Sequence, residues 1–301
     1  PAVNRAECDA CKFIEKTMNT NLLIALKNLS ENPVQDLKNF YTGANRMNNM
    51  GEALELYVKD AFCNTFDLDD ATQKNEVFQE KFSYVGNQNN PPDIILKGGD
   101  AIEVKKIESR TAGIALNSSH PKDKLYADSK MITDACRTCE VWQEKDILYV
   151  VGSVIQNRLS SLWFVYGDCY AANKEIYERI KNVISDALQN QTDLELAETN
   201  ELGRVNRVDP LGITLLRIRG MWHIENPNSV FRYVLPNGLP TTEELSIYAI
   251  VLTKKYLSFP LSDRQSIESS RCKVSNIKIK NPNNPAQLLE AKLISFNGGQ
   301  Q

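Results

Sequence analysis

The chain has 301 residues, of which 42% are hydrophobic and 24% charged. This is ordinary globular composition, so a collagen-like, coiled-coil or mainly disordered chain is excluded. The formal net charge is −3, which by itself argues against a nucleic-acid partner because such domains are usually basic. No apolar run reaches the roughly 18–20 residues of a membrane span. Seven cysteines without a signal peptide predict reduced thiols and a cytoplasmic protein.

Helical and strand patterns alternate in the first two thirds of the chain. Apolar residues at helical spacing predict helices over 20–29, 47–66 and 171–190. Strand patterns occupy 77–85, 93–97, 101–107, 145–155, 161–169, 211–219, 245–253 and 275–280. Residues 109–124 are predicted to be a polar loop, and the acidic segment 191–203 a linker or solvated edge. The sequence therefore predicts an α/β fold with a mixed sheet, flanking helices and a β-richer C-terminal region.

The first residues of the chain show no secondary-structure pattern. Residue 1 is proline, and a helix-like pattern opens only after Met18. Residues 1–17 are therefore expected to be an N-terminal extension, and residues 18–301 a single domain.

The segment from Asp93 to Lys105 carries the chemistry. Alternate residues of a strand share a face, so Glu103 and Lys105 lie on one side and Ile102 and Val104 on the other. Buried charges are costly unless they are paired or bound to a metal. An acid and a lysine on one face of a central strand therefore predict a functional site.

The turn between the two strands decides whether Asp93 joins this face. A two-residue turn, Gly98-Gly99, would place Asp93 and Glu103 on opposite faces. A three-residue turn, Gly98 to Asp100, would pair Asp93 with Lys105 and bring all three charges together. We predict the three-residue turn or an equivalent bulge, since glycine supplies the positive φ that it needs.

Two carboxylates on one face can hold a hard divalent cation such as Mg²⁺. A neighbouring lysine can orient the attacking water or stabilise developing negative charge. A further acid often comes from a helix packed on the sheet. Glu52 and Glu55 lie three residues apart on the predicted 47–66 helix, hence near one face, and either could reach the metal.

These residues resemble a known motif. Pro92-Asp93 followed by Glu103-Val104-Lys105 resembles the PD-(D/E)XK motif of nucleases and type II restriction endonucleases. In that family a glycine commonly precedes the helical acid by four positions, as Gly51 precedes Glu55, which favours Glu55 over Glu52. The longer run from Asn90 to Glu108, with the segments 115–119 and 121–125, is similar to the NgoPII-type restriction endonucleases.

The resemblance covers about residues 45–225 and implies a function. It implies a restriction-endonuclease-like mixed sheet, Mg²⁺, and a homodimer that cuts double-stranded DNA at a short palindrome, GGCC. Asp93 and Glu103 would bind the metal with Glu55 (less favourably Glu52), and Lys105 would be catalytic. The nuclease core would span about 45–190 and the DNA-recognition region about 203–301. A cognate DNA methyltransferase is expected as a companion activity.

DNA contacts need local positive charge. Arg217 and Arg219 alternate on one strand face, and arginine bidentate to guanine is the commonest major-groove contact. Lys122 and Lys124 are better suited to phosphate. The predicted DNA-binding residues are Asn117, Ser118, Ser119, Lys122, Lys124, Arg204, Arg207, Arg217 and Arg219.

Other interpretations remain open at this point. The Asp93, Glu103 and Lys105 face could be a solvated ion pair, and the arginines a solvated strand edge. Cys8, Cys11, Cys136 and Cys139 have zinc-ligand spacing, although plain thiols are favoured. The alternative functions are a repair or junction-resolving nuclease of the same superfamily and a non-catalytic DNA-binding module.

Overall fold

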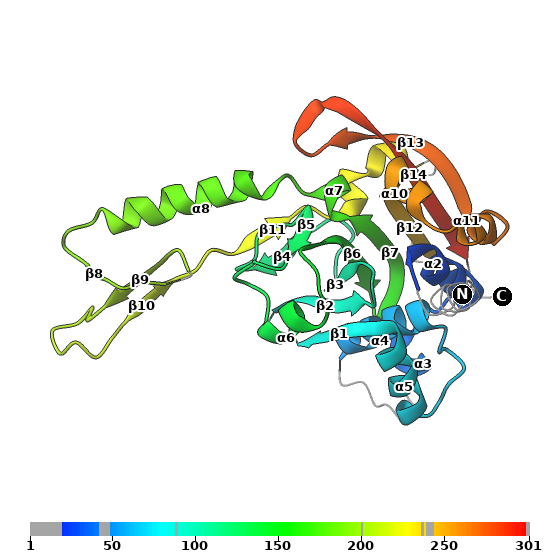
Figure 1. The fold of residues 1–301 in the computed structure, drawn as a ribbon, viewed down its shortest axis with the longest axis horizontal. Helices are drawn as coiled ribbons and strands as arrows, with labels where there is room; N and C mark the ends of the chain where they lie inside the picture. Colours follow the sequence, from blue (N-terminus) through cyan, green and yellow to red (C-terminus); the bar gives the residue numbers. More distant parts are fainter. Residues whose placement is uncertain are drawn as a thin grey trace, which may run out of the picture.

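A large mixed β-sheet forms the centre of the molecule (Figure 1). The computed structural model describes residues 20–41, 49–87, 90–199, 201–235, 238 and 244–298. The strands follow one another across the sheet in the order β1 (Phe82–Asn87), β2 (Asn90–Leu96), β3 (Ala101–Ile107), β6 (Glu144–Ile155), β7 (Arg158–Tyr166), β12 (Leu245–Leu252), β14 (Asn284–Gly298) and β13 (Lys273–Asn281). β3 runs parallel to β6 and β7 runs parallel to β12, while the other neighbours are antiparallel.

The middle strands are buried on both faces. β7 and β12 are apolar and buried along almost their whole length, as expected of central strands covered on each side. β5 (Lys124–Tyr126) adds a short antiparallel pairing to β6. This rigid centre holds the β2–β3 hairpin at one end of the sheet.

Four N-terminal helices pack beside this hairpin: α2 (Leu22–Glu31), α3 (Leu37–Phe40), α4 (Met50–Cys63) and α5 (Ala71–Lys81). The Asn49 side chain caps α4 by accepting a hydrogen bond from the Glu52 N–H. α4 contacts β3. It also lies close to β6, because a Cβ at Gly152 would come within 2.6 Å of Leu54 Cδ2. Glycine at position 152 thus permits the close packing that carries Glu55 toward β3.

A buried ion pair ties these helices together. Asp60 on α4 accepts hydrogen bonds from Lys74 Nζ at 2.6 Å, Tyr41 Oη at 2.8 Å and Thr65 Oγ1 at 2.6 Å. Each partner comes from a different segment, so one carboxylate fixes α4 relative to α5 and α3. A buried charge that is fully hydrogen-bonded is tolerated, whereas loss of one partner is strongly destabilising.

An arm, residues 174–221, projects from the side of the sheet (Figure 1). It contains α8 (Lys174–Gln189), β8 (Glu195–Leu196), β9 (Gly203–Asn206) and β10 (Leu216–Ile218), and the last three form a small sheet. β11 (Trp222–Ile224) brings the chain back and pairs with β4 (Ile114–Asn117). The arm is therefore anchored beside the polar segment that follows β4.

The remaining helices cover the rest of the sheet. They are α6 (Asp134–Thr138), α7 (Gly167–Tyr170), α9 (Pro227–Val230), the 3-10 helix η1 (Arg232–Val234), α10 (Thr253–Ser258) and α11 (Leu261–Glu268). Within the described residues, no helix is both long and apolar enough to span a bilayer.

The predicted fold class, a mixed α/β sheet flanked by helices, is confirmed. Four local predictions are wrong. Residues 167–169, predicted to end a strand, belong to α7, and only 216–218 of the predicted strand 211–219 form a strand, β10. Residues 77–81 end helix α5, and the strand begins only at Phe82; α5 buries only Lys74 and Phe78, so its helical periodicity is weak in the sequence. The segment 109–124 is not wholly a loop, because it contains β4, whose partner β11 lies more than a hundred residues later. The proposed extension, residues 1–17, lies outside the described residues.

Candidate active site

The β2–β3 hairpin places the three predicted charges on one face, but in a different register from the predicted one. Ile95 pairs with Ala101 and Ile94 with Ile102, so the three-residue turn is Lys97–Gly99, one residue earlier than expected. Gly98 has φ +65, the left-handed position that the turn requires. The predicted pairs Asp93–Lys105 and Ile95–Glu103 are therefore wrong.

The side chain of Asp100 explains this register. Asp100 is buried and accepts hydrogen bonds from Tyr166 Oη at 2.6 Å and from Lys255 Nζ at 2.7 Å. Its backbone oxygen also accepts from the Leu96 N–H at 2.9 Å. These contacts hold Asp100 at the start of β3 rather than in the turn. The observed register still puts Asp93 and Glu103 on the same side of the hairpin, opposite Ile94 and Ile102.

Asp93 is fixed by backbone contacts. Its Oδ2 accepts a hydrogen bond from the Val104 N–H at 2.6 Å, beyond the last pair of the β2–β3 ladder. On the other side β1 approaches closely at Gly86, where a Cβ would clash with the carbonyl oxygen of Pro92. The Pro92-Asp93 corner therefore fits only against a glycine on β1.

Glu103 and Lys105 form a half-buried ion pair. Lys105 Nζ lies 2.5 Å from Glu103 Oε1. Glu103 itself is buried, and its second oxygen, Oε2, has no hydrogen-bond partner. Burial lowers the pKa of Lys105, but the negative charges of Glu103 and Asp93 outweigh this and raise it. The lysine is therefore held in its charged form.

The pKa of Asp93 is raised to about 7, first by burial and then by the negative charge of Glu103. Asp93 and Glu103 repel each other when both are ionised, and one oxygen of Glu103 is buried without a partner. This pair of carboxylates is a donor set that fits a hard divalent cation. Across the described residues, no cluster brings three or more His, Cys, Asp or Glu side chains together. Asp93 and Glu103 are thus the two carboxylates that could hold such an ion.

The two predicted helical acids differ in their relation to this pair. Glu55 is close enough that its charge raises the pKa of both Asp93 and Lys105. Its carboxylate is also paired with Lys59 Nζ at 2.7 Å. Glu52 lies in the first turn of α4, one turn farther toward its N-terminus.

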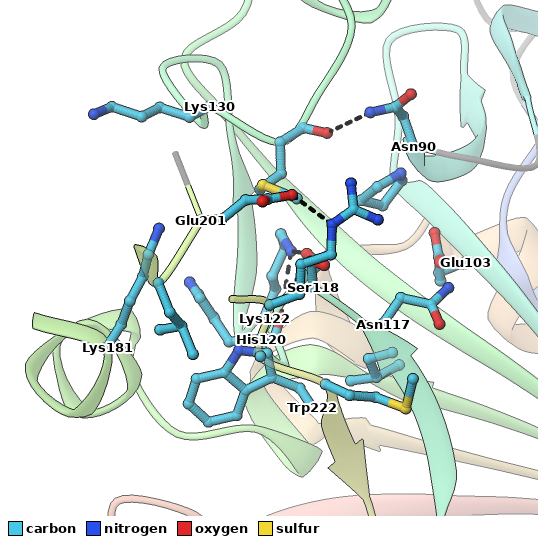
Figure 2. Close-up of a pocket in the computed structure, with 18 of the residues that line it drawn as sticks. Asn90, Glu103, Asn117, Ser118, His120, Lys122, Lys130, Lys181, Glu201 and Trp222 are labelled. Carbon is cyan, nitrogen blue, oxygen red and sulfur yellow. Dashed lines mark hydrogen bonds and ion pairs between the residues drawn. The ribbon is translucent and has the colours of Figure 1, made fainter. Parts of the chain in front are cut away.

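A cavity of about 830 Å³ opens over this face and extends to the arm. Figure 2 shows it between Glu103 on one side and Lys181 of α8 on the other. Asp93, Lys105 and six of the nine predicted DNA-binding residues line it: Asn117, Ser118, Ser119, Lys122, Arg217 and Arg219. Lys124, Arg204 and Arg207 are not among the lining residues.

Lys122 lies deeper than a surface phosphate contact. It is buried, and its Nζ donates hydrogen bonds to Ser119 Oγ and, at 3.3 Å, to the His120 carbonyl oxygen. Both acceptors are neutral. Burial lowers the pKa of Lys122 to about 8, although the charge of Glu103 acts in the opposite direction. A positively charged group without an acidic partner thus lies on the cavity wall.

The three predicted contacts that do not line the cavity have other surroundings. Lys124 Nζ pairs with Glu144 at 3.0 Å and with Asp146 at 3.1 Å. Arg207 lies 3.6 Å from Glu195 on the exposed arm, and Arg204 is exposed on β9.

The cysteine pairs give no complete zinc site to describe. Cys8 and Cys11 lie outside the described residues. Cys136 is buried in an apolar cluster with Tyr84, Ile95 and Leu125, and burial raises the pKa of its thiol to about 12. A protonated thiol in apolar surroundings is a poor metal ligand.

His120 and Trp222 line the cavity near the arm, and both rings pack against Tyr177 behind them. His120 stacks on Tyr177 with 5.2 Å between ring centroids, and Trp222 meets Tyr177 edge to face at 5.6 Å. His120 Nδ1 lies 2.8 Å from the Pro121 carbonyl oxygen, and burial lowers the pKa of the imidazole. These contacts join α8, β11 and the segment after β4 into one wall.

Glu201 is the cavity residue that the sequence interpretation missed. It belongs to the acidic segment read as a linker, yet it lines the cavity (Figure 2). Its carboxylate binds both Arg217 and Arg219. A usable signal was present: Glu201 precedes the predicted strand 211–219, which carries both arginines, so an acid in the preceding segment could pair with two bases across a turn.

Comparison with known proteins gives the family to which this chain is similar. Residues 20–283 match the family described as NgoPII restriction endonuclease. The chain is also 49% identical over 278 residues to the type II restriction enzyme NgoPII of Neisseria gonorrhoeae, an alignment that covers 92% of this chain and 99% of that protein. No solved structure matches. The matched region contains every residue of the site described above.

Proposed function

Because the chain belongs to the NgoPII restriction endonuclease family, we propose that it is a type II restriction endonuclease that hydrolyses double-stranded DNA at a short palindrome, with Mg²⁺ as its cofactor. One observation carries the site assignment: Asp93 and the buried Glu103, which has an unpartnered oxygen, lie beside Lys105 in a large cavity. The Neisseria gonorrhoeae relative, a type II restriction enzyme, supports the reaction class.

Asp93 and Glu103 would hold the cation, with Glu55 as an auxiliary acid and Glu52 less favoured. When bound, Mg²⁺ supplies Lewis-acid polarisation of the phosphoryl oxygen and lowers the pKa of water. Lys105 would orient the attacking water and offset negative charge that develops on the phosphate. Lys122, with only neutral hydrogen-bond partners, would contact a DNA phosphate.

Recognition is assigned to the cavity wall opposite the carboxylates. Asn117 at the end of β4 and Ser118 and Ser119 directly after it would contact DNA, and Arg217 and Arg219 would read bases. Arginine pairs most often with guanine, which agrees with the proposed GGCC site. Arg204, Arg207 and Lys124 would then contribute weaker phosphate contacts at the margin. A cytoplasmic methyltransferase of the same specificity would protect host DNA.

Cleavage assays test the proposal. Purified protein is incubated with unmethylated plasmid DNA and Mg²⁺, and the fragment ends are sequenced. We expect discrete fragments from the wild-type protein, and loss of cleavage in Asp93→Asn and Lys105→Met, with Ca²⁺-supported binding of DNA retained in Lys105→Met. Lys106→Met is the matched control, because Lys106 is the neighbouring lysine and pairs with the exposed Glu108 at 2.6 Å.

The outcomes separate the alternatives. Undiminished cutting by either variant would refute the residue assignment. Cutting of branched or mismatched DNA alone would favour a repair nuclease, and no cutting with any divalent cation would favour a binding module.

A further inference from the structure

One carboxylate of the arm holds two arginines of the cavity wall. Arg217 binds Glu201 through two hydrogen bonds, Nε to Oε2 at 3.0 Å and Nη2 to Oε1 at 2.6 Å. Arg219 Nε donates to Oε1 at 2.5 Å. Two guanidinium groups therefore share a single negative charge, and one positive charge of the cluster remains unbalanced.

The three side chains differ in exposure. The Glu201 side chain is 16% exposed, whereas those of Arg217 and Arg219 are 54% and 57% exposed. Glu201 thus lies beneath the arginines rather than in front of them. Hydrogen bonding from Arg217 is the main reason that the pKa of Glu201 is lowered, so this carboxylate is ionised at neutral pH.

The backbone fixes Glu201 in this place. The next residue, Leu202, donates its N–H to the Ile218 carbonyl oxygen at 3.1 Å and accepts from Ser185 Oγ of α8 at 3.1 Å. Arg217 pairs with Arg204 in the β9–β10 ladder. The carboxylate and the two arginines are consequently carried by one small sheet that is tied to α8.

The hydrogen bonds engage the Nε side of each guanidinium group, and the Nη1 side of each is not among them. The Nη1 side presents parallel N–H groups that suit guanine O6 and N7. An arginine side chain loses rotamer entropy when it is ordered, and holding it in place before DNA binds lowers the entropy loss on recognition.

We infer that Glu201 is a positioning residue for base recognition, which holds Arg217 and Arg219 with their outer N–H groups directed at guanines of the DNA in the cavity. This inference rests on the proposed function. Glu201 would then raise discrimination between sites rather than affinity for DNA in general. A carboxylate that merely occupied the place of a DNA phosphate would instead weaken binding to every duplex.

The test compares binding of two duplexes in Ca²⁺, one with the site that the protein cuts and one with that site scrambled. Dissociation constants are measured by fluorescence anisotropy for the wild-type protein, Glu201→Gln, Arg217→Ala and the double variant. We expect Glu201→Gln to reduce the affinity ratio about tenfold while changing binding of the scrambled duplex less than about twofold. When Arg217→Ala is already present, adding Glu201→Gln should reduce the affinity ratio clearly less than Glu201→Gln does in the wild-type protein.

Glu290→Gln is the control, since Glu290 pairs with Lys278 at 3.2 Å on the exposed β13–β14 hairpin. Tighter binding of both duplexes by Glu201→Gln would overturn the inference, as would an unchanged ratio. If Arg217→Ala lowers the ratio and Glu201→Gln does not, only the role of Glu201 fails. If Arg217→Ala leaves the ratio unchanged, base reading by this arginine fails, and the inference fails with it.

Discussion

Asp93 is partly buried beside the like charge of Glu103, so its ionised form raises the free energy of the folded protein. Its pKa of about 7 in the folded chain compares with about 3.9 for an unperturbed aspartate. Between these values the folded protein binds a proton more tightly than the unfolded chain. Its contribution to stability therefore falls as pH rises from about 4 through 7.

We expect Asp93→Asn to stabilise the protein in the absence of divalent cations. Asparagine keeps an oxygen to accept the Val104 N–H and removes the charge. At pH 8 the free energy of unfolding should rise by about 1–4 kcal/mol, and the gain should vanish near pH 4. Denaturant melts in EDTA at both pH values measure this. A less stable variant at pH 8 would contradict it, and Glu108→Gln, at an exposed acid, serves as the control.

At the residue scale, the sequence predicted which face of the hairpin carries the charges but not the strand register that places them there. Alternation along β3 placed Glu103 and Lys105 together. The register depended instead on Asp100, whose partners Tyr166 and Lys255 are 66 and 155 positions away. Burial of Lys122 likewise depends on the fold around Ser119 and His120, and a polar loop in the sequence gives no sign of it.

At the scale of elements, α4 decides which helical acid can act on the site. Glu55 influences the pKa of Asp93 and Lys105 from a position against β3. Glu52 lies in the first helical turn, where an acid also interacts favourably with the helix dipole. The two residues have the same side chain and the same helix, so they form a matched pair.

We expect Glu55→Gln to lower the rate of Mg²⁺-dependent cleavage about tenfold or more, and Glu52→Gln to change it far less. Single-turnover cleavage of a short duplex measures the effect, with thermal melts to verify folding. Equal rates for the two variants would show that α4 contributes no auxiliary acid.

Elements whose faces are both buried were predicted best. β6, β7 and β12 appear in the sequence as long apolar runs, and α2 and α4 as clear helical patterns. α5 and β4 were missed because one is nearly all polar and the other is four residues long with a partner far along the chain. Short strands gain their stability from such partners rather than from their own residues.

At the scale of the whole molecule, the cavity exists because the arm returns to the body. Pairing of β11 with β4 brings residues 201–222 next to residues 116–122. No local pattern predicts that contact. The proposed division into a nuclease core at 45–190 and a recognition region at 203–301 stays a prediction, and β12–β14 of the second part belong to the same central sheet.

The arm also offers a surface for the proposed homodimer. α8 has no buried residue, and Ile176, Ile180, Val183 and Ile184 on it are 40–59% exposed. A twofold axis requires a self-complementary patch. These four side chains share one face of α8, so two antiparallel copies of the helix would bury the same apolar patch on each chain.

We therefore expect the wild-type protein to be a dimer in solution. Val183→Glu should convert it to a monomer that cleaves double-stranded sites less. Analytical ultracentrifugation measures the mass of each protein, and Lys273→Glu, at an exposed position on β13, is the control. A wild-type monomer with full activity would contradict the homodimer. If Val183→Glu is still a dimer, the dimer interface lies elsewhere on the protein.

The aromatic wall gives the cavity an optical reporter of its own. The chain has three tryptophans. Trp163 is fully buried and donates to Asn228 at 2.7 Å, and Trp142 packs against the apolar cluster around Ile95. Trp222 alone of the three lines the cavity, against His120 and Tyr177. A duplex that enters would change the polarity around one indole and leave the other two as an internal reference, so unlabelled DNA can be followed by intrinsic emission.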